Sequence, residues 1–192
     1  MGRRPAALLR LSLIVVCCLI TGAPAAVLWA QNADGETAAE DGGETATSPQ
    51  VGRRSGAKLP RFVALRAPEV NMRTGPGTRY PIDWVYQRRN LPVEIIDEYD
   101  TWRRVRDHEG TSGWIHQSML HARRFVLITS DEGAVLRRDP QDDARPVALL
   151  ETGVIGHVES CGEIWCVVEV QALKGWLRRD QIFGVYPDEE VR

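Results

Sequence analysis

One pattern of residues occurs twice in the chain, and its spacing is nearly the same in both copies. The offset changes only from 64 residues between Met72 and Leu136 to 62 residues between Gly113 and Gly175. A domain of about 60 residues buries only roughly 60% of the surface that its unfolded chain exposes, so it is marginally stable alone. The repeat therefore predicts two small domains of one architecture that pack together. The first copy contains Met72-Arg73, Trp102, Val105, Gly113-Trp114 and Leu120, and the second contains Leu136-Arg137, Trp165, Val168, Gly175-Trp176 and Ile182.

Near the start of each copy, the residues predict a strand that ends in a turn. Apolar and polar residues alternate over residues 70–73, as they do in a half-buried strand. Gly75-Pro76-Gly77 follows, where proline has no N–H to donate and glycine accepts a positive φ. Asp139-Pro140 replaces this turn in the second copy. From these residues alone, an ordinary turn remains an open alternative to a functional loop.

The order of motifs between Val70 and Leu120 resembles the bacterial SH3-like (SH3b) domain family. The resemblance implies a small barrel of roughly five or six strands. It also implies an extracytoplasmic protein in which the domain binds or targets and does not catalyse. The motifs that carry the resemblance are Asn71-Met72-Arg73-Thr74-Gly75-Pro76-Gly77, Trp102-Arg103-Arg104-Val105 and Gly113-Trp114-Ile115.

The expected fold is therefore all-β, with two tandem SH3-like barrels packed together. We assign the first barrel to residues 60–122 and the second, with a C-terminal tail, to residues 123–192. Pro187 cannot continue a ladder in the middle of a sheet, so the last residues are expected to form a tail strapped onto the barrel. The connection His121–Arg124 is short, and we expect one rigid body with two lobes.

The first thirty residues read as a secretory signal peptide. Three arginines, Arg3, Arg4 and Arg10, precede an apolar core that runs from Leu11 to Ile20, and small residues follow it. An uncleaved membrane anchor is the alternative, because residues 11–30 carry no charge and are long enough to cross a bilayer. Residues 31–59 are rich in alanine, glycine, glutamate and threonine and are expected to form a disordered linker. Both features predict an exported protein of the periplasm or cell envelope.

Beyond the signal segment the chain contains two cysteines, Cys161 and Cys166. An even pair in an exported chain favours a disulfide. Residues 162–165 would form a short hairpin loop that places the two cysteines opposite each other, at a distance that a disulfide can span. A nucleophilic cysteine near His157, or a zinc site that combines His157 with both cysteines, are alternatives that the spacing leaves open.

Aromatic and arginine side chains of the first barrel are the candidates for ligand binding. Trp102 and Val105 are three residues apart, so in a regular strand they point to opposite faces and the tryptophan faces outward if the valine is in the core. An arginine fork suits carboxylates. The alternative is that the aromatic residues only fill the barrel core and pack the two lobes together. The candidate ligand-binding residues are Tyr80, Trp84, Tyr86, Trp102 and Arg104.

Charge and motifs exclude several classes of function. A formal net charge of −2 gives no field that would recruit nucleic acid. No catalytic triad, metal motif or nucleotide loop is found in the sequence, so we expect no enzyme, no metal and no cofactor. The resemblance then implies a non-catalytic binding module, with cell-wall peptide or an envelope protein as partner. A membrane would be contacted only through an uncleaved signal segment, and the sequence does not fix the oligomeric state.

A structural scaffold, or a regulator that acts in trans on a cell-wall hydrolase, is the alternative function. Burial of Trp84 and Trp102 between the lobes would favour the scaffold, and exposure of both would favour a binding surface.

Overall fold

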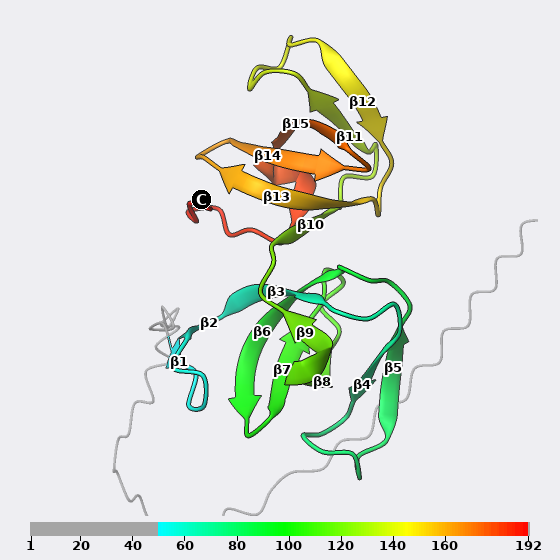
Figure 1. Ribbon diagram of the computed structural model, residues 1–192, viewed down its shortest axis with the longest axis vertical. Helices are drawn as coiled ribbons and strands as arrows, with labels where there is room; N and C mark the ends of the chain where they lie inside the picture. The colour runs from blue at the N-terminus through cyan, green and yellow to red at the C-terminus, as the bar shows by residue number, and fades with distance from the viewer. Residues whose placement is uncertain (1–49, 192) are drawn as a thin grey trace, which may run out of the picture. The chain divides into compact units, whose positions relative to one another are not determined.

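The structure is a computed structural model that describes residues 50–191, and these residues form β-strands with two short 3₁₀ turns. The expected signal segment, residues 1–30, and residues 31–49 of the expected linker lie outside the described residues. Two sheets of seven strands each account for most of the described chain. Figure 1 shows that each sheet is built from its own continuous part of the chain.

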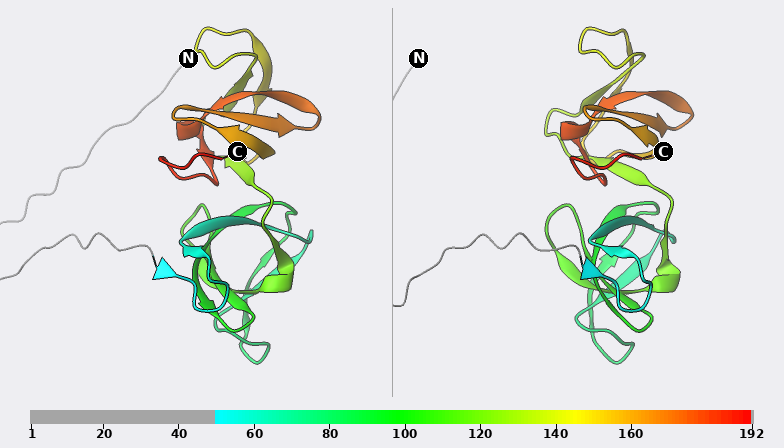
Figure 2. Two further views of the ribbon diagram at one scale, coloured as in Figure 1. Left: turned by 60° about the vertical axis from the view of Figure 1, so that its left-hand side comes forward. Right: turned by 90° about the vertical axis from the view of Figure 1, so that its left-hand side faces the viewer.

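The first sheet has the strand order β5-β4-β8-β7-β6-β3-β9, and all of its pairs are antiparallel. Its strands curve round a common centre, as the two views in Figure 2 show. The turn η1 (Gln117–Met119) precedes its last strand. The strands are β3 (Arg61–Leu65), β4 (Val70–Arg73), β5 (Ile82–Tyr86), β6 (Pro92–Tyr99), β7 (Trp102–Arg106), β8 (Ser112–His116) and β9 (Leu120–His121).

The second sheet repeats the first strand by strand, in the order β12-β11-β15-β14-β13-β10-β16. The predicted all-β fold of two tandem barrels is therefore confirmed. Each sheet has one or two strands more than expected because short strands join its edge. The turn η2 (Arg179–Gln181) occupies the place of η1. The strands are β10 (Phe125–Ile128), β11 (Ala134–Arg137), β12 (Pro146–Leu150), β13 (Ile155–Cys161), β14 (Trp165–Val170), β15 (Leu173–Arg178) and β16 (Ile182–Phe183).

Close packing explains the repeated Gly-Trp pair. A Cβ atom at Gly175 would lie 2.6 Å from the carbonyl oxygen of Arg137 and 2.7 Å from a carbon of Leu136. At Gly113 it would lie 2.6 Å from a carbon of Met72. Only glycine therefore lets β8 approach β4 and lets β15 approach β11, which closes each barrel.

Replacement of Gly175 by alanine is expected to destabilise the protein by about 1–3 kcal/mol, because the added carbon meets backbone that cannot rotate away. The measurement is urea unfolding followed by circular dichroism. Gly162→Ala is the matched control, because a Cβ atom there has its nearest neighbour at 3.8 Å, an ordinary contact. Equal stability of the two variants would contradict the explanation.

A hairpin before the first barrel corrects the expected linker boundary. Residues 50–59 were assigned to the linker, but β1 (Gln50–Val51) pairs with β2 (Lys58–Leu59) in a small two-stranded sheet. Ser55 donates to Glu98 from its backbone N–H at 3.0 Å and from its hydroxyl at 2.7 Å. These bonds to a distant carboxylate order a segment whose composition alone would leave it flexible.

Glu98 and Arg103 form a buried ion pair in the first barrel. They are direct partners in the register of β6 and β7, and their side chains are 0% and 6% exposed. Arg61 also donates to Glu98, at 2.9 Å. Burial alone would raise the pKa of Glu98, but the hydrogen bonds from Ser55 and Arg61 and the charge of Arg103 outweigh it and lower the pKa to about 2.

The second barrel places a disulfide where the first has this ion pair. Cys161 and Cys166 are direct partners in the register of β13 and β14, and they are bonded, with a Cα–Cα distance of 4.0 Å. Each lies 63 residues after its counterpart, since 98 + 63 = 161 and 103 + 63 = 166. The predicted disulfide is confirmed. The nucleophile and zinc alternatives are wrong, because both sulfurs are bonded to each other.

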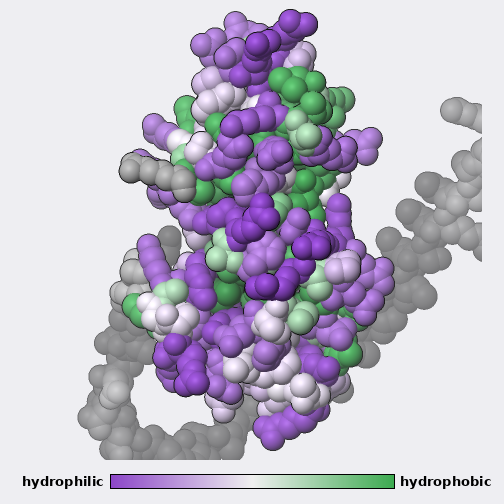
Figure 3. Space-filling view, in the orientation of Figure 1, coloured by the Kyte–Doolittle hydropathy of each residue, from purple (hydrophilic) through white to green (hydrophobic). Residues whose placement is uncertain are grey.

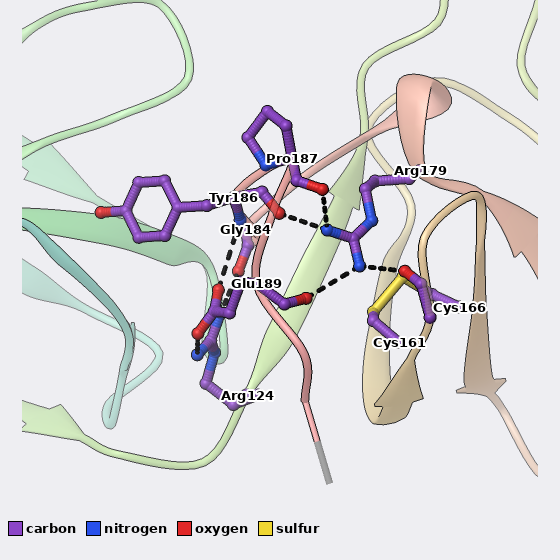
Figure 4. Close-up of a disulfide and its surroundings, with 9 residues drawn as sticks. Arg124, Cys161, Cys166, Arg179, Gly184, Tyr186, Pro187 and Glu189 are labelled. Carbon is purple, nitrogen blue, oxygen red and sulfur yellow. Dashed lines mark hydrogen bonds and ion pairs between the residues drawn. A yellow bond between two sulfur atoms is a disulfide. The ribbon is translucent and has the colours of Figure 1, made fainter.

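After β16, a C-terminal tail is held against the second barrel by two arginines (Figure 4). The guanidinium of Arg179 donates to the carbonyls of Tyr186, Pro187, Glu189 and Gly162. Arg124 holds both carboxylate oxygens of Glu189, at 2.5 and 2.8 Å. The tail then reaches the disulfide, where Cys161 donates its backbone N–H to Val191 at 3.0 Å.

The two barrels share packed side chains. The ring of Phe62 lies 5.1 Å from the ring of Phe183 and 4.6 Å from that of Tyr186. The Tyr186 hydroxyl donates to Glu94 of β6 at 2.8 Å, and Arg88 donates to the carbonyl of Gly153 at 2.7 Å. The expected packing of one barrel on the other is confirmed, and its aromatic contacts come from residues outside the predicted ligand-binding set.

Candidate functional site

The outer face of the first sheet carries a row of arginine and tryptophan side chains. Trp114 of β8 pairs with Arg73 of β4 on one side and with Arg104 of β7 on the other. These residues face away from the core, because their neighbours Arg103, Val105 and Ile115 are buried. We call the surface formed by Arg73, Trp102, Arg104, Trp114 and His116 the outer face.

Trp102 and His116 extend the outer face at one end of β7 and β8. They are direct partners in the register, and their rings meet edge to face with centroids 5.4 Å apart. His116 covers part of the indole, so Trp102 is half-buried. The predicted outward orientation of Trp102 holds in the structure, and a histidine provides its cover.

Arg104 is the charged group that this surface leaves available. Its side chain is exposed, and it makes no hydrogen bond or ion pair with any residue in the range 50–191. Arg106, the next outward arginine on β7, is held by Glu94 with a shortest distance of 2.6 Å. Arg104 therefore combines a free guanidinium fork with the neighbouring ring of Trp114, an arrangement that suits a planar carboxylate beside an apolar group.

Arg73 has a structural role that the sequence pattern did not reveal. Its Nη1 atom donates to the carbonyls of Tyr80 at 2.7 Å and Thr78 at 3.2 Å, which are both in the loop between β4 and β5. The equivalent Arg137 donates to the carbonyl of Ala144 at 3.1 Å in the loop between β11 and β12. Recurrence of an arginine at the same place in both copies was the signal that could have identified this loop anchor.

Tyr80 belongs to the same loop. A Cβ atom at Gly75 would lie 2.4 Å from the Tyr80 ring, so the ring lies directly on the Gly-Pro-Gly turn. Arg79 covers the ring, with its guanidinium carbon 5.2 Å from the centroid. Tyr80 is thus half-buried by its own loop and stands apart from Trp102 and His116.

Two of the predicted site residues lie on the opposite side of the sheet. Trp84 pairs with buried Met72, so it points to the inner side of the edge strand β5, where it remains 52% exposed. Tyr86 is 6% exposed, and its hydroxyl donates to Asp107 at 2.8 Å. Burial, together with this bond to a carboxylate, raises the pKa of Tyr86. The five predicted residues therefore do not form one groove, and only Trp102 and Arg104 belong to the outer face.

The second barrel lacks an equivalent of the outer face. Val167 takes the place of Arg104 opposite Trp176, and Arg178 takes the place of His116 opposite Trp165. Arg178 forms ion pairs with Asp142 at 3.1 Å and Asp180 at 3.2 Å. The exposed free arginine is thus particular to the first barrel.

Other classes of site are not found in the described part of the chain. Among residues 50–191, no group of three or more histidine, cysteine, aspartate or glutamate side chains could hold a metal ion. Nor does this range include a helix with the length and apolar character needed to cross a membrane.

Comparisons with known proteins agree with the repeat. A family model described as "Bacterial SH3 domain" matches residues 66–121 and again residues 130–184. A curated relative from Bacillus subtilis (strain 168), named "Putative N-acetylmuramoyl-L-alanine amidase YrvJ", is 25% identical over 127 residues. That match covers 57% of this chain and 24% of the relative, so the chain matches about a quarter of the relative's length.

Two solved structures also align with the chain. The structure of NlpC2 from Trichomonas vaginalis is 11% identical, with a TM-score of 0.31 over 66% of this chain and 49% of that one. The structure of NlpC1 from the same organism is 12% identical, with a TM-score of 0.29 over 69% of this chain and 48% of that one. At such TM-scores neither alignment adds to the description of the fold.

Proposed function

Since the chain belongs to the bacterial SH3 domain family and carries two copies of the domain, we propose that it is a non-catalytic, exported module that binds the peptide part of the cell wall. The outer face of the first barrel is the binding surface in this proposal. The second barrel supports it, through the contacts of Phe62 with Phe183 and Tyr186.

The observation that carries the proposal is the unpaired guanidinium of Arg104 beside half-buried tryptophan rings. Peptides of the cell wall present carboxylates and apolar carbons close together. An arginine fork binds the carboxylate, and a neighbouring indole covers the carbons. The tryptophan and arginine enrichment of binding hot spots supports the same surface.

Two further points support a wall-binding module. The curated relative is named as an amidase, and the chain matches about a quarter of it, which is the extent expected of an accessory region shared with a longer protein. The described residues also lack the clustered titratable side chains that a hydrolytic site or a metal centre needs.

A structural scaffold, or a regulator of a wall hydrolase in trans, is the second candidate. It would be favoured if Trp84 and Trp102 were consumed between the barrels. Trp84 is 52% exposed instead, and Trp102 is covered by His116 of its own barrel. These two placements favour a free binding surface over a scaffold whose aromatic residues are used internally.

The exported chain is expected to sediment with purified peptidoglycan, and added salt should weaken this association because a surface arginine contributes to it. Soluble peptide released from the wall should compete, whereas the isolated glycan strands should not. The measurement is the fraction of protein in the pellet across a series of wall concentrations. Protein that stays in the supernatant at every wall concentration would contradict the proposal.

A further inference from the structure

The two barrels differ at one end of their inner faces. In the first barrel, Met72 pairs with Trp84 and Val70 pairs with Tyr86. In the second barrel, the same register pairs Leu136 with Ala148 and Ala134 with Leu150. Two aromatic rings on β5 thus correspond to an alanine and a leucine on β12.

The neighbouring strand changes in the same direction. Val105 and Val168 pair with the two equivalent glycines of the Gly-Trp motifs, so Asp107 and Val170, each two residues further on, occupy equivalent places. Asp107 accepts the hydrogen bond of the Tyr86 hydroxyl. Val170 is a buried apolar residue. The second barrel has therefore lost the aromatic rings together with the carboxylate that one of them needed.

A pocket of about 280 Å³ lies where these side chains are missing. Pockets for whole small-molecule ligands start at roughly 300 Å³. The pocket therefore matches a single large side chain better than a free ligand. Its apolar lining includes Ala148, Leu149, Leu150, Val154 and Leu173. Leu149 is 74% exposed and Leu173 is 46% exposed, and Figure 3 shows hydrophobic side chains gathered over β12.

Acidic side chains surround this apolar opening. Glu151 lines the pocket and is exposed. Asp131 and Glu132 are also exposed, and their turn is held beside it because Thr152 donates to the carbonyl of Ser130 at 2.5 Å. The nearby cation, Arg88, already donates to the carbonyl of Gly153. Three carboxylates against one engaged guanidinium favour a positively charged partner.

We infer that the pocket at β12 receives an aromatic side chain from a basic segment of a partner protein. The first barrel shows what fills this place, because its own Trp84 and Tyr86 occupy it. The second barrel presents the apolar walls without a ring, and the acidic rim selects lysine or arginine next to the incoming aromatic residue. The inference is independent of the outer face, which lies on the other barrel.

The test uses the full chain and two short probes, the blocked tripeptides acetyl-Lys-Trp-Lys-amide and acetyl-Lys-Ala-Lys-amide. Methyl NMR signals of Leu150, Val154 and Leu173 are followed during titration. The tryptophan peptide is expected to shift them to saturation and to bind at least about tenfold more tightly than the alanine peptide. Equal binding of the two peptides, or no shift of these methyl signals, would overturn the inference.

Variants separate the pocket from the rest of β12. Ala148→Trp supplies the missing ring from the chain itself and should abolish the shifts. If that variant does not fold, Leu149→Lys serves instead and should weaken binding by about tenfold, since it places a charge on the lining. Val147→Lys is the matched control, because Val147 is exposed on the same strand but does not line the pocket. Binding that Val147→Lys reduces as much as Leu149→Lys would refute the site.

Two other occupants are also tested. Contacts between these methyl groups and a tryptophan ring, seen in the free protein without peptide, would mean that the pocket is filled by Trp29 of the same chain or by a second copy. Either result would overturn the assignment to a partner protein. Dilution distinguishes them, because only contacts with a second copy weaken as the protein concentration falls.

Discussion

Replacement of Glu98 by glutamine is expected to lower the free energy of unfolding by about 3 kcal/mol, because the buried guanidinium of Arg103 then lacks a counter-charge. Arg61 and Ser55 lose the same acceptor, so the hairpin of β1 and β2 should loosen as well. Urea unfolding measures the total change. Amide hydrogen exchange locates it, and protection should fall first in β6 and β7.

The same substitution should remove an acid dependence of stability. The pKa of Glu98 falls from an ordinary value of 4.5 to about 2 on folding. A depressed carboxyl pKa adds stability that is fully present above about pH 4.5 and is lost as the pH falls toward 2. This difference corresponds to roughly 3 kcal/mol. The wild-type chain should therefore weaken over this range, and the variant should weaken much less.

Glu69→Gln is the matched control for both measurements, because Glu69 is an exposed carboxylate of the same barrel. Its effect should stay within about 0.5 kcal/mol, as for other surface substitutions. If Glu98→Gln behaved like Glu69→Gln, the ion pair would not be a determinant of the first barrel's stability.

Loss of the disulfide through the double substitution Cys161→Ala and Cys166→Ala is expected to cost about 2–4 kcal/mol. The short loop that the bond closes accounts for about 2 kcal/mol of chain entropy. The remainder comes from two buried sulfurs, since Cys161 is 5% exposed and Cys166 is 0% exposed. Hydrogen exchange should show the loss in β13 and β14, and at the backbone N–H of Cys161 that pairs with Val191 of the tail.

The two predictions control each other, because the ion pair and the disulfide occupy the same register position in different barrels. Glu98→Gln should affect the first barrel more, and the cysteine variant should affect the second barrel more. Identical exchange patterns in both variants would contradict a local role for either pair. Wild-type protein treated with a reductant should resemble the cysteine variant.

Much of the fold could be predicted because the repeat and the Gly-Trp pairs are local signals with strict packing reasons. The glycines at 113 and 175 are required by the approach of a neighbouring strand, so their spacing reports the register. The disulfide was predictable because it joins residues across a short hairpin. The hairpin of residues 50–59 was missed, since its order depends on Glu98, a residue distant in the sequence.

The site was harder to predict because residue type does not fix the direction of a side chain. Alternation placed Trp102 outward correctly, since its neighbours fix the phase of β7. Tyr86 was expected to contact a ligand, but its bond to Asp107 and its burial depend on a contact across the barrel. Trp84 lies on the inner side of an edge strand because it pairs with Met72. The structural role of Arg73 was hidden, because its acceptors are backbone carbonyls of a loop.

The most direct test of the proposed binding surface compares two tryptophans of the first barrel. Trp102 lies on the outer face, and Trp84 lies on the other side of the sheet and is more exposed. Affinity for purified peptidoglycan is measured for Trp102→Ala and Trp84→Ala, with hydrogen exchange to confirm that both variants fold. We expect Trp102→Ala to weaken binding by about tenfold or more and Trp84→Ala to leave it nearly unchanged. Unchanged binding of Trp102→Ala, or an equal loss in both variants, would contradict the account.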